Sequence, residues 1–156
     1  MLLINIPGQI DLQIKYLVSD VNGTLAVDGE LIPGVKEALN ALRSILEIHL
    51  LTADTYGRQS IIDQQLNTKA ILIKPGDEAK QKADYIRRLG VEYCAALGQG
   101  ANDEDMIRNA ALGICILSRE GAYPPTLQAA KIVVTDIITA LELFRYPKRI
   151  TATLRR

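Results

Sequence analysis

The chain has 156 residues, the length of one domain with an ordinary hydrophobic core, and its formal net charge is zero. Its two cysteines, Cys94 and Cys115, lie in apolar stretches without metal-ligand spacing or a C-x-x-C pair. We therefore expect reduced, buried thiols, and the spacing argues against a zinc site and a thioredoxin-type redox pair. The lack of tryptophan argues against a base-stacking surface for single-stranded nucleic acid.

Residues 2–6 and 10–14 alternate apolar and polar side chains around Pro7-Gly8, which predicts an antiparallel β-hairpin within residues 1–15. From Tyr16 onward, short apolar runs alternate with segments of helical period. The predicted strands are 17–19, 47–51, 70–73, 93–97, 113–117 and 132–134, and the predicted helices are 33–44, 56–66, 77–89, 104–111 and 137–144. This order predicts a single-domain α/β fold, a Rossmann-like three-layer α/β/α sandwich with a parallel sheet.

The segments between the predicted strands are too short to hold a cap domain. A flap at 26–31, with a turn at Asp28-Gly29, is the only local segment that could act as a gate. After Glu142 every charged residue is basic, which predicts a basic tail over 145–156, either solvated or docked on an acidic partner.

No apolar stretch approaches the ~20 residues that a membrane span requires, and the N-terminus lacks a basic segment followed by an apolar run. We therefore expect a cytoplasmic protein without a membrane partner. The missing cap leaves a homo-oligomer open, with one subunit covering the crevice of another.

The run Tyr16-Leu17-Val18-Ser19-Asp20-Val21-Asn22-Gly23-Thr24-Leu25 is the most informative part of the chain. An apolar strand ends at Asp20, and Gly23 permits a tight turn directly after it. In open α/β sheets, ligands bind in the crevice outside the carboxyl ends of the strands. A carboxylate at that place can act as a nucleophile.

Three further segments follow in a regular order. A second strand ends in Thr52-Ala53-Asp54, Lys82 lies in the next helical segment, and residues 98–107 read GQGANDEDMI. Together with 20–25, these segments resemble the four motifs of the haloacid dehalogenase-like phosphohydrolases, with Asn22 where the first motif has its second aspartate and Gln99 where the fourth has an aspartate. Within that superfamily, the Thr52-Ala53-Asp54 and Gly100-Ala101-Asn102-Asp103 segments are similar to those of the small soluble P-type-ATPase-like proteins, which have no cap.

The resemblance implies a role for each matching residue. Asp20 would attack phosphorus and form an aspartyl-phosphate, while Thr52 and Lys82 would hold the phosphoryl group. The predicted catalytic residues are Asp20, Asn22, Thr52 and Lys82; the predicted phosphate contacts are Val21, Asn22, Gly23, Thr24, Thr52, Ala53 and Lys82, with the amides of residues 22–24 forming an anion-binding nest. The predicted Mg²⁺ ligands are Asp20, the Asn22 carbonyl, Asp103 and Gln99, with Asn102 and Asp54 in secondary positions.

Asn22 limits this prediction, because an amide cannot exchange a proton at neutral pH as the replaced aspartate does. Asp28 or Glu30 on the flap could partly replace that acid. Lys80 and Lys74 compete with Lys82 for its role, and Asp103 could instead cap the helix that starts near Glu104.

The sequence thus predicts a Mg²⁺-dependent phosphohydrolase or phosphotransferase that acts on a phosphorylated substrate. Two alternatives remain. One is a catalytically weakened phosphate- or nucleotide-binding module, and the other is a phosphoacceptor that needs a partner to be dephosphorylated.

Overall fold

The computed structural model describes all 156 residues, and a parallel sheet forms its centre. The strands are β1 (Leu2–Ile4), β2 (Leu12–Ile14), β3 (Tyr16–Asp20), β4 (Ala26–Val27), β5 (Glu30–Leu31), β6 (Glu47–Thr52), β7 (Ile71–Leu72), β8 (Cys94–Gly98), β9 (Leu112–Ile116) and β10 (Ile132–Val134). The helices are α1 (Val35–Leu42), α2 (Gln59–Leu66), α3 (Glu78–Leu89), α4 (Glu104–Asn109), α5 (Pro124–Ala129), α6 (Ile137–Arg145) and α7 (Lys148–Leu154), with 3-10 turns η1 (Val91–Tyr93) and η2 (Ala101–Asp103).

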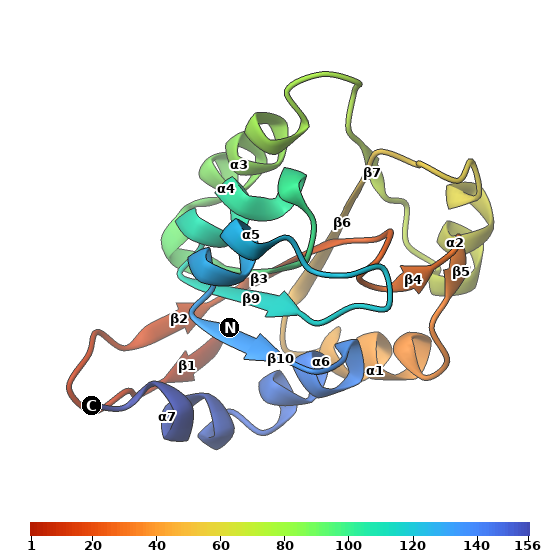
Figure 1. The fold of residues 1–156 in the computed structure, drawn as a ribbon. Coiled ribbons are helices and arrows are strands. Elements are labelled where there is room, and N and C mark those ends of the chain that lie inside the picture. The colour runs from red at the N-terminus through yellow and green to blue at the C-terminus, as the bar shows by residue number, and fades with distance from the viewer.

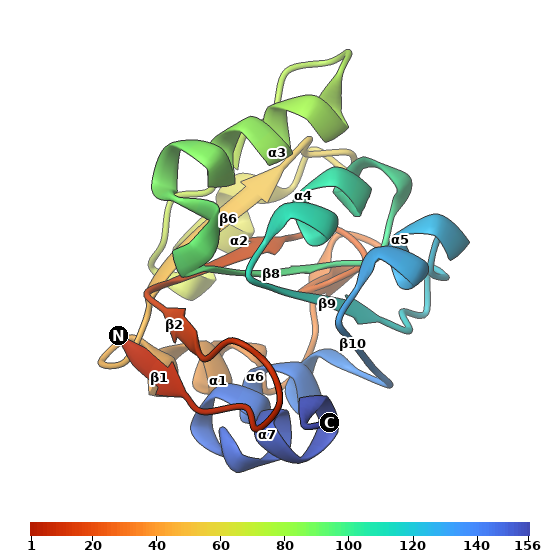
Figure 2. The same ribbon diagram turned by 90° about the vertical axis from the view of Figure 1, so that its left-hand side faces the viewer.

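The main sheet has six strands in the order β10-β9-β8-β3-β6-β7, and all five pairings are parallel. From β3 the chain moves outward to β6 and β7, and it then returns to β8 on the other side of β3. The reversal lies between β3 and β8, which is where such folds open a crevice at the carboxyl ends of their strands. The predicted α/β/α architecture is therefore confirmed (Figures 1 and 2).

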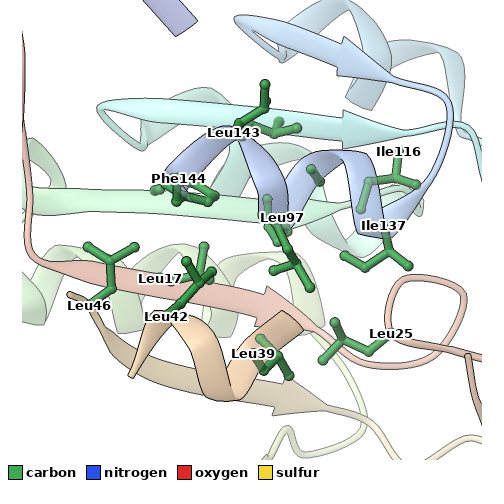
Figure 3. Close-up of a cluster of buried hydrophobic side chains, with 14 of the residues drawn as sticks. Leu17, Leu25, Leu39, Leu42, Leu46, Leu97, Ile116, Ile137, Leu143 and Phe144 are labelled. Atoms are coloured by element: carbon green, nitrogen blue, oxygen red, sulfur yellow. The ribbon is translucent and has the colours of Figure 1, made fainter. Parts of the chain in front are cut away.

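Alternate side chains along β3 pack on opposite faces of the sheet. Leu17 belongs to the larger core cluster, which joins the sheet to α1, α2 and α6, whereas Val18 belongs to the smaller one, which joins it to α3 and α4. Figure 3 shows Leu17 facing Leu42 of α1 and Phe144 of α6 in the larger cluster. Each fully buried side chain of this kind contributes about 1.5–3 kcal/mol of folding free energy. This packing fixes the end of β3.

Two small antiparallel hairpins flank the sheet, and the first of them confirms the hairpin predicted within residues 1–15. Strands β1 and β2 pair from Leu2↔Ile14 to Ile4↔Leu12. Strands β4 and β5 form the flap, and its turn residues Asp28 and Gly29 have φ angles of 53° and 77°. The connection from β3 to β6 thus contains this flap and α1.

Two helices differ from the sequence prediction. Helix α5 was not predicted, and most of the predicted basic tail at 145–156 is helix α7. Ile150 of α7 is fully buried, and Thr151 donates a hydrogen bond of 2.9 Å to the Asn5 carbonyl beside β1. A single buried apolar residue gives little helical periodicity, so this packing could not be seen in the sequence. No helix in the structure combines the length and apolar character needed to traverse a lipid bilayer.

Candidate active site

Asp20 lies at the carboxyl end of β3, beside the ends of β6 and β8. Its side chain contacts Lys82 from α3, whose Nζ is 2.7 Å from Asp20 Oδ1. The same Nζ lies 2.7 Å from Asp103 Oδ1. All three side chains are buried, and Lys82 and Asp103 are fully inaccessible to solvent. One ammonium group thus joins two carboxylates that are 83 residues apart in the sequence.

Lys82 is therefore the lysine that reaches Asp20. Lys80 lies on the exposed face of α3 and pairs with Asp84 at 3.1 Å. Helix α3 begins at Glu78, so Lys82 stands one turn inside the helix rather than at its start. Asn102 adds a weaker contact, with Oδ1 3.4 Å from Lys82 Nζ, and its amide donates to Glu78 at 2.8 Å.

Asp103 is held rigidly by the backbone. Its Oδ2 accepts hydrogen bonds of 3.0 Å from the amides of Gln99 and Gly100, so both carboxylate oxygens have protein partners. Its side chain does not cap α4. Gly98 packs against it so closely that a Cβ there would lie 2.6 Å from Asp103 Cγ. Asp103 therefore holds the Lys82 ammonium group in a fixed position.

Burial and the neighbouring charges shift the pKa values of both Asp20 and Lys82. Burial and the neighbouring Asp103 carboxylate raise the pKa of Asp20 to about 7, although Lys82 and a 3.1 Å hydrogen bond from Thr24 to Asp20 oppose that change. Burial disfavours the charged form of Lys82, but Asp20 and Asp103 outweigh it, and the Lys82 pKa is raised. Lys82 consequently stays protonated.

Asn22 and Thr52 connect the first two motif segments. Asn22 Nδ2 donates to Thr52 Oγ1 at 3.2 Å, and the amide of Asp54 donates to the same oxygen at 2.9 Å. Asp54 itself does not face the phosphate site, contrary to the sequence prediction. It adopts a φ of 52°, and its carboxylate accepts from the amide of Gln59 at the start of α2.

The predicted anion-binding nest is not formed by Gly23 and Thr24. The Gly23 amide donates to Ala26 at 2.6 Å and the Thr24 amide to Val21 at 3.1 Å, so the turn uses both donors itself. Gly23 has a φ of 81°, a left-handed backbone conformation that favours glycine at this position. Val21 is fully buried.

A cavity of about 190 Å³ opens above Asp20. Eight residues line it: Asp20, Asn22, Ala53, Thr55, Tyr56, Gln99, Asn102 and Glu120. Gln99 reaches into this space, with Nε2 3.5 Å from the Asn22 carbonyl oxygen. No group of three or more His, Cys, Asp or Glu side chains gathers here as a ready-made metal cage.

Sequence reasoning missed the outer wall of this cavity. Tyr56 follows β6, Glu120 lies in the loop after β9, and the Tyr56 hydroxyl donates a hydrogen bond to the Glu120 carboxylate. Neither residue belongs to a motif, and only the fold brings the two loops together. Asp28 and Glu30, the predicted replacements for the missing acid, line a separate cavity of about 440 Å³ between the flap and α6.

No protein-family model matches the chain. Among curated proteins, it is 47% identical over 60 residues to the uncharacterized protein MJ0073 of Methanocaldococcus jannaschii, covering 38% of this chain and 64% of that protein. It is 49% identical over 39 residues to the uncharacterized protein MJ0072 of the same organism, covering 25% of this chain and 89% of that protein. A protein named "Probable copper-transporting ATPase HMA5" of Arabidopsis thaliana is 29% identical over 136 residues, which are 81% of this chain and 13% of the ATPase. The chain thus spans less than two thirds of MJ0073 and a small part of HMA5.

Solved structures share the fold over most of their length. The 3-deoxy-D-manno-octulosonate 8-phosphate phosphatase of Moraxella catarrhalis, in complex with magnesium, phosphate and KDO, superposes with a TM-score of 0.65 at 19% identity, covering 89% of this chain and 90% of that one. The cobalt-bound enzyme of Haemophilus influenzae gives 0.67 at 16% identity, with 92% and 94% covered. A phospho-aspartyl intermediate analogue of phosphoserine phosphatase gives 0.62 at 15% identity, with 86% and 99% covered.

These three structures are phosphatases, and a "putative HAD superfamily (subfamily III A) hydrolase from Legionella pneumophila" shares the fold as well, with a TM-score of 0.68 at 16% identity, covering 90% of this chain and 87% of that one. The chain has the haloacid dehalogenase-like fold, and it belongs to the same family as the uncharacterized protein MJ0072.

Proposed function

We propose that this chain is a phosphohydrolase that works through an aspartyl-phosphate on Asp20. The observation that carries the proposal is the buried Asp20–Lys82–Asp103 cluster at the carboxyl end of β3, beneath a small polar cavity. A carboxylate fixed there can attack a phosphoryl group that enters the cavity. The phosphatase fold of the neighbours, one of them solved as a phospho-aspartyl analogue, supports the same chemistry.

Lys82 supplies the positive charge that this reaction needs. Phosphoryl transfer spreads negative charge over the equatorial oxygens, and a fixed cation beside the nucleophile stabilises it. Asp103 holds the ammonium group in place through the two amides that bind its other oxygen. The Thr24 hydroxyl donates a hydrogen bond to Asp20 Oδ2, and this bond restricts the rotation of the nucleophilic carboxylate.

The donor set fits a hard divalent cation with several bound waters. Asp20, the Asn22 carbonyl and Gln99 lie at one cavity, whereas Asp103 is occupied by Lys82 and the backbone. Mg²⁺ commonly binds through one or two carboxylates and keeps water ligands. We propose that Mg²⁺ is held by Asp20, the Asn22 carbonyl and Gln99, with Asp103 behind them. When bound, it would neutralise charge on the phosphoryl oxygens.

Asn22 favours a second candidate, a phosphoacceptor that discharges slowly. Its amide is bonded to Thr52 and can neither give nor take a proton during the reaction. Loss of general acid–base help costs about 10²–10⁴-fold in rate. In that case Asp20 would still be phosphorylated, and the phosphoenzyme would persist.

One experiment tests the first proposal and separates it from the second. The protein is incubated with Mg²⁺ and a panel of acyl, aryl and alkyl phosphates, with Asp20→Asn as the matched variant and beryllofluoride as a phosphate analogue. We expect turnover that Asp20→Asn abolishes. Beryllofluoride binding without turnover supports the phosphoacceptor, and binding of neither Mg²⁺ nor any phosphate analogue rules out both.

A further inference from the structure

Glu120 lines the cavity above Asp20 but belongs to none of the four sequence motifs. Of the eight lining residues, only Asp20 and Glu120 carry a carboxylate. Asp20 forms the buried floor, whereas Glu120 is exposed at the mouth. The cavity is therefore lined by one buried carboxylate, Asp20, and one exposed carboxylate, Glu120.

The position of Glu120 is held from two sides. The Tyr56 hydroxyl donates to its carboxylate from the loop after β6. On the other side, the Tyr123 amide donates to the Gln99 carbonyl at 2.8 Å, which ties the end of the Glu120 loop to the end of β8. A Cβ at Gly23 would lie 3.0 Å from Glu120 Oε2, so this oxygen stands directly over the turn that follows the nucleophile.

This geometry matches an in-line displacement. The attacking and leaving oxygens of a phosphoryl transfer lie on opposite sides of phosphorus. With Asp20 at the floor, the leaving group departs toward the mouth, and a hydrolytic water later enters from there. A metal ligand would instead have to lie on the floor beside Asp20. Asp28 and Glu30 line the other cavity, and Glu30 pairs with Arg58 at 3.6 Å.

We propose that Glu120 is the acid–base residue of this site and does the proton transfer that Asn22 cannot. This inference rests on the proposed function. In the first step, an Asp20 oxygen bonds to phosphorus and the bond from phosphorus to the leaving oxygen breaks. In the second, water bonds to phosphorus, its proton passes to the Glu120 carboxylate, and the bond to Asp20 breaks, which releases phosphate. The protonated Glu120 then gives that proton to the next leaving oxygen.

The test measures the phosphoenzyme rather than turnover alone. The chain is phosphorylated with acetyl phosphate and Mg²⁺, the phosphate donor is removed, and decay of the acid-stable, hydroxylamine-sensitive phosphoenzyme is followed. Glu120→Gln should form phosphoenzyme nearly as fast as the native chain, because acetate leaves without protonation. Its decay should slow by about 10²–10⁴-fold. Asn22→Asp in the Glu120→Gln chain should restore fast decay, which a merely structural role for Glu120 would not allow.

Glu30→Gln is the matched control, because it removes an exposed carboxylate from the neighbouring flap, and it should decay at the native rate. Native decay in Glu120→Gln, or equal slowing in Glu30→Gln, overturns the role of Glu120 and leaves the aspartyl-phosphate proposal standing. If the native chain forms no phosphoenzyme while Asp20→Asn behaves identically, the proposed function fails, and the role of Glu120 fails with it.

Discussion

Gly98 and Asp103 are in such close contact that no side chain fits between them: a Cβ on Gly98 would lie 2.6 Å from Asp103 Cγ and 2.7 Å from its Cβ. Asp103 cannot retreat, because the amides of Gln99 and Gly100 and the ammonium of Lys82 hold it. Gly98, at the end of β8, therefore leaves the space that Asp103 needs in order to hold Lys82.

We expect Gly98→Ala to destabilise the fold by about 1–3 kcal/mol, the usual cost of overpacking a filled site, and to weaken beryllofluoride binding. Urea unfolding and binding of the analogue measure the two effects. Gly100→Ala is the matched control, since its nearest contact would be 3.4 Å and its φ is negative. Equal loss in both variants would contradict the explanation.

Lys82→Met should destabilise the protein by about 3–5 kcal/mol, because it leaves two buried carboxylates without their cation. Lys80→Met, on the same helix, breaks only the exposed pair with Asp84 and should cost less than 1 kcal/mol. Chemical denaturation of the two variants provides the comparison. Similar values for both would mean that the buried cluster contributes nothing to folding.

Asp136 caps α6 and provides a test of pH dependence. Its carboxylate accepts a 2.7 Å hydrogen bond from the Thr139 amide, and this bond lowers the pKa of Asp136. A lowered pKa in the folded state stabilises the protein above the pKa of the unfolded chain, near 3.8, and that stabilisation disappears as the pH falls through the folded value. We expect Asp136→Ala to cost about 1 kcal/mol at pH 7. The difference from the native protein should shrink below pH 4 in thermal or urea unfolding, while Asp136→Asn, which can still cap, should lose less at pH 7.

Cys94 should be inert in the folded protein. Burial, with a smaller contribution from Glu92, raises the pKa of its thiol to about 11, and burial also raises the pKa of Cys115. At pH 8, on the order of 0.1% of a thiol with that pKa is thiolate, the form that reacts. An aromatic disulfide reagent should therefore label neither cysteine until denaturant is added. Rapid labelling of the native protein would show that these strands open readily.

The parts of the site that could be predicted are those that local sequence determines. An apolar run ending in Asp20, with Gly23 three residues later, places a carboxylate at a strand end whatever the rest of the chain does. Thr52 is predictable for the same reason. The competition between Lys80 and Lys82 could not be settled locally, because the face of α3 that points inward depends on how the helix packs.

Other features depend on contacts between distant segments. The amides of Gly23 and Thr24 donate hydrogen bonds within their own turn. The residue composition of the turn does not indicate which hydrogen bonds it forms. Glu120 reaches the cavity only because β9 lies two strands from β3. Asp54 looks equivalent to a site residue in sequence, yet its positive φ turns its carboxylate toward α2.

The contact between the two ends of the chain has a consequence for synthesis on the ribosome. Thr151 bonds to Asn5, 146 residues earlier, and the Arg156 amide donates to the Pro7 carbonyl at 3.1 Å. The hairpin of β1 and β2 is synthesised well before α7 and cannot dock on it until residues 148–156 have emerged from the ribosome. We therefore expect the hairpin residues that are buried in the finished fold, including Ile4 and Ile6, to remain exposed and available to a chaperone until α7 has been made.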